Sequence, residues 1–176
     1  MLNTGKWGWG VVLFCALLLS GCGYYFPHVY EGPARVVYMP TWKNRTSKLG
    51  LDNKIYQSLA HWFQKSEKVA LTKDKTKADL ILAGEIISID LPSISWDGVS
   101  TATGTKVRLI VRYVLKDLTT GAILWEVPNK LYTSDYTVKT ANVTADDEAL
   151  TTIIDEMSEH LYLGTLNKIR KQYVQK

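Results

Sequence analysis

The segment from Lys106 to Lys116 alternates between two sets of side chains. A period of two residues places each set on its own face of a β-strand. One face carries Lys and Arg with two aliphatic residues between them. Any fold of this chain must therefore cover the other face, which is wholly apolar, and can leave the basic face in water. The apolar face comprises Val107, Leu109, Val111, Tyr113 and Leu115.

Two other segments that precede this strand also read as strands. Residues 35–39 form a short β-branched run that ends at Pro40. Residues 78–91 are nearly continuous in aliphatic side chains, which predicts a central strand covered on both faces or a strand with a bulge at Gly84. The polar and basic residues 41–48 read as a loop between elements.

A fourth strand follows the basic one. Residues 119–121 form a turn in which Gly121 is available for a positive φ. The chain then returns antiparallel from Ile123 to Val138. Pro128 interrupts this segment, so we expect it to be an edge strand or to carry a bulge.

Two segments have the spacing of amphipathic helices. The first begins at Leu51, and His61 lies off its apolar stripe and should face water. The second begins near Thr144, where the acidic residues 146–148 favour the helix dipole. The apolar stripes are Leu51, Ile55, Leu59, Trp62 and Phe63 in the first helix, and Leu150, Ile154, Met157 and Leu161 in the second.

A second apolar stripe follows in the last helix and lies on a different face. Either Gly164 kinks the helix so that the same core is served, which we favour, or this face is exposed for a partner. The stripe comprises Tyr162, Leu166, Ile169 and Tyr173.

The order of elements predicts the fold class. A strand, a helix, a three-stranded antiparallel meander and a helix are typical of an α+β fold. We expect a two-layer sandwich, with two helices packed on one face of a four-stranded mixed sheet. The opposite sheet face should be basic and aromatic. Residues 35–176 would form this single domain.

The N-terminus reads as a targeting segment. Lys6 is followed by an uncharged apolar run and then by Leu-Ser-Gly-Cys, which predicts a lipoprotein signal peptide over residues 1–21. Cys22 would be acylated, and residues 22–34 would tether it to the domain. Gly23 at the next position is similar to lipoproteins sent to the outer membrane. The alternatives are an ordinary signal peptide with an incidental Cys, or a short membrane anchor.

The sequence carries little sign of catalytic or metal chemistry. The chain has 21 Lys and Arg against 17 Asp and Glu. This positive surplus is too small to indicate nucleic-acid binding. No His or Cys pair has metal-ligand spacing, and no phosphate-binding or dinucleotide-binding motif occurs. Residues 146–148 could hold a cation, but at a helix start they fit a dipole-matching cap better. A Ser/His/Asp catalytic triad whose members come together only in the folded protein would leave no motif in the sequence. We expect no enzyme, metal or cofactor.

Several segments together resemble a known family. Their order and the Cys resemble LptE, the lipopolysaccharide-assembly lipoprotein of the outer membrane. These segments are Leu19-Ser-Gly-Cys-Gly-Tyr24, Val36 to Pro40 with Asn44 and the helix from Leu51, Ala78 to Glu85, and Val107 to Trp125.

The resemblance implies a non-catalytic lipoprotein in the outer membrane. Members of this family sit as a plug in the lumen of the LptD β-barrel, support its assembly and contact lipopolysaccharide. No catalytic residue comes with the resemblance. Two other classes stay open: a structural lipoprotein of a different envelope machine, and a lipid-anchored periplasmic hydrolase.

One end of the predicted sandwich could bind a lipid anion. The antiparallel order should bring Lys106, Arg108 and Lys139 together at one tip, with Trp96 in the adjoining loop of residues 92–105. Lys and Arg neutralise phosphate, and an amphipathic ring suits an acylated head group. The alternative is that these charges only keep the end of a loop soluble.

Overall fold

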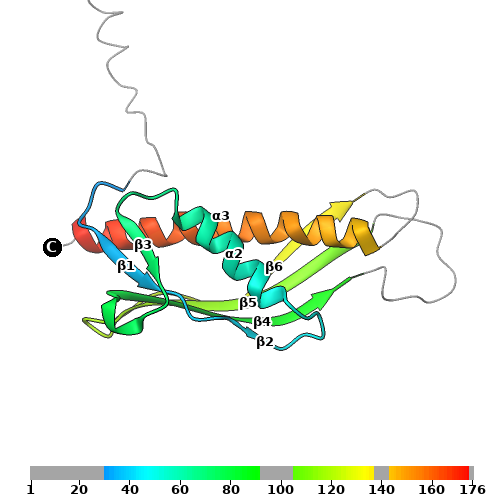
Figure 1. Ribbon diagram of the computed structural model, residues 1–176, viewed down its shortest axis with the longest axis horizontal. Coiled ribbons are helices and arrows are strands. Elements are labelled where there is room, and N and C mark those ends of the chain that lie inside the picture. Colours follow the sequence, from blue (N-terminus) through cyan, green and yellow to red (C-terminus); the bar gives the residue numbers. More distant parts are fainter. Residues whose placement is uncertain (1–29, 92–104, 137–142, 175–176) are drawn as a thin grey trace, which may run out of the picture.

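The computed structural model describes residues 30–91, 105–136 and 143–174, and the statements below concern these residues. A twisted sheet forms one layer, and two helices cover one of its faces (Figure 1). The opposite face of the long strands has no described element over it. The elements are β1 (Arg35–Tyr38), β2 (Lys43–Asn44), α2 (Leu51–Phe63), β3 (Val69–Thr72), the 3₁₀ helix η1 (Lys75–Lys77), β4 (Leu80–Asp90), β5 (Thr105–Asp117), β6 (Ile123–Tyr136) and α3 (Val143–Val174).

The sheet is mixed, and its strand order is β3-β1-β4-β5-β6, with β2 also paired to β4. The pairs of β1 with β3 and β4, and of β2 with β4, are parallel. The pairs β4–β5 and β5–β6 are antiparallel. The α+β class, the two helices and the mixed sheet are as predicted. The predicted number of four strands is wrong, because the sheet has six.

The two missed strands are short. β2 has two residues and lies in the segment expected to be a loop. β3 has four residues and pairs in parallel with β1. Strands of this length carry no readable alternation, so their pairing is decided by the neighbouring strand and not by their own sequence.

The alternation of β5 is confirmed, since the five predicted apolar residues are at most 3% exposed. The predicted bulge in β4 is displaced. The register shift lies between Ile86 and Ser88, and Gly84 pairs regularly with Tyr113. Gly84 serves another purpose: a Cβ there would overlap the ring of Trp42, which packs on this inner face.

Strand β6 meets both expectations raised by Pro128. It lies at the end of the strand order, and its register with β5 shifts between the partners of Val111 and Tyr113, where Pro128 and Asn129 stand opposite Arg112. Gly121 in the preceding turn has a φ of 76°.

Helix α2 buries its predicted stripe and leaves His61 exposed. Helix α3 buries both of its stripes, because α2 packs on one side of it and the sheet on another. Tyr162 meets Phe63 of α2 with ring centroids 5.4 Å apart. Of the second stripe only Tyr173 is exposed. The helix continues past Gly164 without a break (Figure 1). Both stripes therefore reach the core without the predicted kink.

Candidate functional site

The candidate site lies on the outer face of β4, β5 and β6, the face turned away from the helices. We define the outer face by the exposed row of β5 and the residues paired with it. Arg108, Arg112 and Lys116 are exposed, and Ile110 and Val114 are half-buried. This confirms the prediction of a basic face. The neighbouring strands add the acids Glu85, Asp90 and Glu126 to it, and Asp135 of β6 stands in register opposite Lys106.

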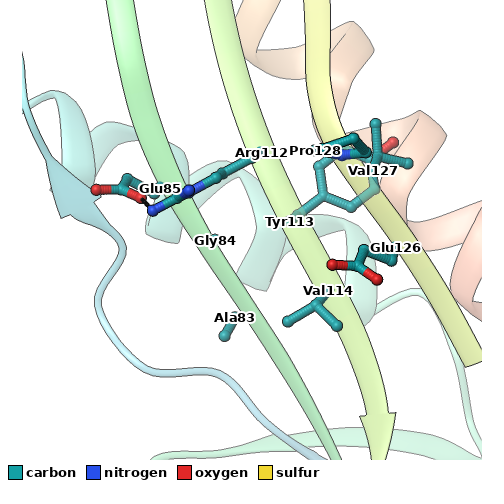
Figure 2. Close-up of a pocket in the computed structure, with 9 residues that line it drawn as sticks. All are labelled: Ala83, Gly84, Glu85, Arg112, Tyr113, Val114, Glu126, Val127 and Pro128. Atoms are coloured by element: carbon teal, nitrogen blue, oxygen red, sulfur yellow. Dashed lines mark ion pairs between the residues drawn. The ribbon is translucent and has the colours of Figure 1, made fainter. Parts of the chain in front are cut away.

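Glu85 joins two arginines in the middle of this face. It pairs in register with Arg112 of β5 and with Lys43 of β2, which brings Arg45 beside it. The Nε of Arg45 and the guanidinium of Arg112 each donate to one carboxylate oxygen of Glu85. Figure 2 shows Arg112 crossing from β5 over β4 to reach Glu85. The cluster ties β2, β4 and β5 together.

The two arginines of this cluster lower the pKa of Glu85. The hydrogen bond from Arg45 lowers the pKa of the Glu85 carboxyl, burial opposes this, and Arg112 adds to the lowering. The side chain of Glu85 is 8% exposed, whereas each arginine side chain is 52% exposed. Sequence reasoning missed Glu85. The sequence feature that could have indicated it is a single acid inside an otherwise aliphatic strand.

A hollow of about 330 Å³ adjoins the cluster over β4, β5 and β6. Arg112 and Glu85 form one side of it, and Glu126 lies at another side, near Val114 (Figure 2). The hollow therefore carries both signs of charge. Because Glu126 faces the same space as Arg112, this part of the outer face is a poor site for an anion.

The tip of the sandwich is the end at which β4 and β6 end and β5 and α3 begin (Figure 1). Lys106 and Arg108 lie there on the outer face, two residues apart on β5. Arg108 stands opposite Asp90 of β4 and Thr133 of β6. The other predicted members of this site, Trp96 and Lys139, lie outside the described residues.

The acidic start of α3 has protein partners. The ammonium of Lys48 lies 2.8 Å from the carboxylate of Asp147, and this contact lowers the pKa of Asp147. Asp146 is buried and also has a partner. Within the described part of the chain, no group of three His, Cys, Asp or Glu side chains is placed to hold a metal ion.

Trp125 and Tyr132 of β6 lie on the inner face, so these two rings do not contribute to the aromatic outer face that was predicted. Trp125 meets Tyr113 at 4.9 Å and His160 of α3 at 5.6 Å between ring centroids. The hydroxyl of Tyr132 lies 2.8 Å from Nδ1 of His160. Burial, assisted by the charge of Lys130, lowers the pKa of His160. These rings belong to the packing between α3 and the sheet.

None of the helices among the described residues has the length and apolarity needed to cross a bilayer.

Comparison with known proteins gives one family match. The model of the LptE family, described as lipopolysaccharide-assembly, matches residues 34–163. No curated protein sequence matches the chain.

Solved structures resemble this chain at low sequence identity. Protein XCC0632 from Xanthomonas campestris has a TM-score of 0.59 and 12% identity, over 81% of this chain and 90% of that chain. The minor lipoprotein from Acinetobacter baumannii has a TM-score of 0.47 and 12% identity, over 76% of this chain and 93% of that one. At this identity the first likeness shows a common fold.

Proposed function

Because the chain belongs to the LptE family of lipopolysaccharide-assembly proteins, we propose that it is a non-catalytic lipoprotein that plugs an LptD-type β-barrel in the outer membrane, supports its assembly and contacts lipopolysaccharide. The observation that carries this proposal is the extent of the family match. Residues 34–163 take in every strand, all of α2 and the first two thirds of α3. The match therefore covers most of the packed sandwich and not a single motif.

The anchor in this proposal is acylated Cys22. Each methylene of an acyl chain that enters the bilayer contributes about 0.8 kcal/mol, so several chains hold a protein permanently. Gly23 at the following position favours delivery to the outer membrane. Residues 22–34 then connect the anchor to β1.

The lipopolysaccharide contact in this proposal is the tip. Lys106 and Arg108 supply two cations on one face of β5. Lys139 would add a third, and Trp96 would add an amphipathic ring. Guanidinium and ammonium groups form charge-assisted hydrogen bonds with phosphate, which an acylated and phosphorylated head group presents. Asp90 offsets part of the charge of Arg108, which argues for a contact by several groups and not by Arg108 alone.

Purification of the acylated protein from native membranes tests the proposed partner. We expect a large β-barrel protein and lipopolysaccharide to remain bound. Recovery of components of another envelope complex in place of the barrel would favour the structural lipoprotein of a different machine. A turnover that one point mutation abolishes would favour an anchored hydrolase. Either result would contradict the proposal.

A further inference from the structure

Tyr30 marks the place where the preceding chain enters the domain. Its side chain is 5% exposed and lies over Gly32, where a Cβ would overlap the Tyr30 ring. Burial raises the pKa of the Tyr30 hydroxyl, and the charges of Arg35 and Arg170 oppose the rise, so both guanidinium groups lie near it. The chain thus enters the domain at a fixed point beside the C-terminal end of α3 (Figure 1).

Basic side chains surround this point. The backbone N–H of Arg35 donates to the carbonyl of Lys68 at 2.8 Å, and the ammonium of Lys68 lies 3.4 Å from the carbonyl oxygen of Glu31. The last turns of α3 add Arg170 and Lys171. We call Arg35, Lys68, Arg170 and Lys171 the basic collar.

The composition of the collar suits a charged bilayer surface. Two exposed acids, Glu31 and Glu67, adjoin its four cations in the sequence, and the carboxylates of Asp79 and Asp117 lie inside the domain beside it, where they accept hydrogen bonds from Val36 and Gln172. Lys68 and Lys171 are exposed, and Tyr173 stands 61% exposed one turn from Arg170. Cations draw a protein to anionic head groups, and tyrosine favours the boundary between head groups and acyl chains.

The length of the preceding chain brings this end close to a membrane. Cys22 stands eight residues before Tyr30, and a fully extended chain of that length spans about 28 Å at most. Helix α3 has 32 residues and is about 48 Å long, so the tip lies far from the collar. The collar end is therefore the end nearest to an acylated N-terminus.

We infer that the basic collar is a second membrane contact, which binds the anionic head groups of phospholipids beside the anchor. This inference goes beyond the lipopolysaccharide contact at the tip, and it rests on the proposed acylation of Cys22 for the orientation of the domain. The binding itself requires only the collar, so it can be measured without the acyl chains.

The test uses the mature chain with Cys22→Ser and vesicles of phosphatidylcholine with or without phosphatidylglycerol. We expect sedimentation with the anionic vesicles and little with the neutral ones. Lys68→Glu combined with Lys171→Glu should weaken binding about tenfold or more, since each basic residue near such a surface contributes about fivefold. At about 1 M salt, where the Debye length is about 3 Å, the difference should vanish.

A matched pair of substitutions controls for net charge. Lys54→Glu with Lys130→Glu makes the same change in charge at two exposed positions on α2 and β6, away from the collar, and it should leave vesicle binding within about twofold of the parent. All four positions are exposed, so thermal melts should agree. If the collar variant unfolds, Lys68→Gln with Lys171→Gln replaces it, and we expect a smaller loss of vesicle binding.

Three results would overturn the inference. An equal loss in both pairs would mean that net charge alone drives binding. Unchanged binding in the collar variants would remove the collar from the membrane contact. Collar variants that keep vesicle binding but lose a barrel partner would assign this end to a protein. Because the vesicles contain neither barrel nor lipopolysaccharide, failure here leaves the proposed function standing, and failure of copurification leaves this inference standing.

Discussion

The indole of Trp125 on β6 occupies the space that a side chain at Gly164 of α3 would need. A Cβ built at Gly164 overlaps carbons of the indole ring, which is rigid and is itself held by Tyr113 and His160. The glycine therefore sets the distance between the helix and the sheet. This contact explains why a long helix keeps a residue of poor helix propensity near its middle.

Gly164→Ala should destabilise the protein, although alanine favours a helix by about 1 kcal/mol over glycine. Overpacking costs about 1–3 kcal/mol, so we expect the overlap with Trp125 to outweigh the gain in propensity. Thermal melts measure the change. In a Trp125→Leu background the substitution should cost less or become stabilising. A Gly164→Ala protein that is more stable than the parent in both backgrounds would show that Trp125 does not limit the approach of α3.

Glu85→Gln should change how stability depends on pH. The pKa of Glu85 is lowered in the folded protein, chiefly by Arg45. A carboxyl of this kind stabilises the fold above its unfolded pKa, and the contribution is lost as pH falls through the folded value. We therefore expect the variant to be less stable at pH 7, to begin to approach the parent as pH falls below about 4, and to converge with it only below the lowered pKa of Glu85 in the folded protein.

Denaturant titrations from pH 7 to acid pH measure this difference. Arg45→Gln is the matched variant and should show a profile of the same shape, because it removes the same hydrogen bond from the other side. A constant difference between parent and Glu85→Gln across this range would mean that the ionised carboxylate adds nothing to the fold.

Ile154→Ala should destabilise the fold by about 2–5 kcal/mol, because it removes a buried side chain and leaves a cavity. Ile154 is 3% exposed in the core between α3 and its neighbours. Glu156→Ala, on the exposed side of the same helix, controls for changes in helix propensity and should alter stability by less than about 0.5 kcal/mol. Equal melting temperatures for Ile154→Ala and the parent would show that this stripe is not core.

Cys22→Ser should release the protein from the membrane or leave it unprocessed. The acyl chains are the anchor in the proposed function, and substitution of the thiol prevents their attachment. Metabolic labelling with a radioactive fatty acid checks this directly. Label that persists in the Cys22→Ser protein would contradict acylation at this residue.

The parts of the fold that the sequence predicts are those with a local period. The alternation in β5 and the stripes of α2 and α3 each mark one buried face, and the structure buries those residues. The strands β2 and β3 could not be read in this way, because their pairing is decided by β4 and β1.

The pairing of β6 with β5 has two register shifts, and the one opposite Arg112 decides on which faces Trp125 and Tyr132 lie. Trp125 and Tyr132 are seven residues apart, so in a regular strand they would lie on opposite faces. The extra residue at Pro128 and Asn129 inverts the alternation, and both rings pair with inward residues of β5. Pro128 indicated an edge or a bulge, but not the consequence for the aromatic residues.

The candidate site was predictable only in part. The basic row of β5 followed from its alternation, and Lys106 and Arg108 lie together on the outer face as expected. The capture of Arg45 and Arg112 by Glu85 joins segments 27–40 residues apart. Such a contact requires the register of three strands, which no single segment encodes.

Binding of purified lipopolysaccharide tests the proposed contact at the tip most directly. Arg108→Asp combined with Lys139→Asp should weaken binding several-fold at about 0.1 M salt and less at about 1 M, because salt screens exposed charges. Lys75→Asp with Lys116→Asp makes the same charge change at two exposed positions away from the tip and should bind like the parent. Equal binding by the tip variant and the parent at both salt concentrations would contradict lipopolysaccharide recognition at this end of the sandwich.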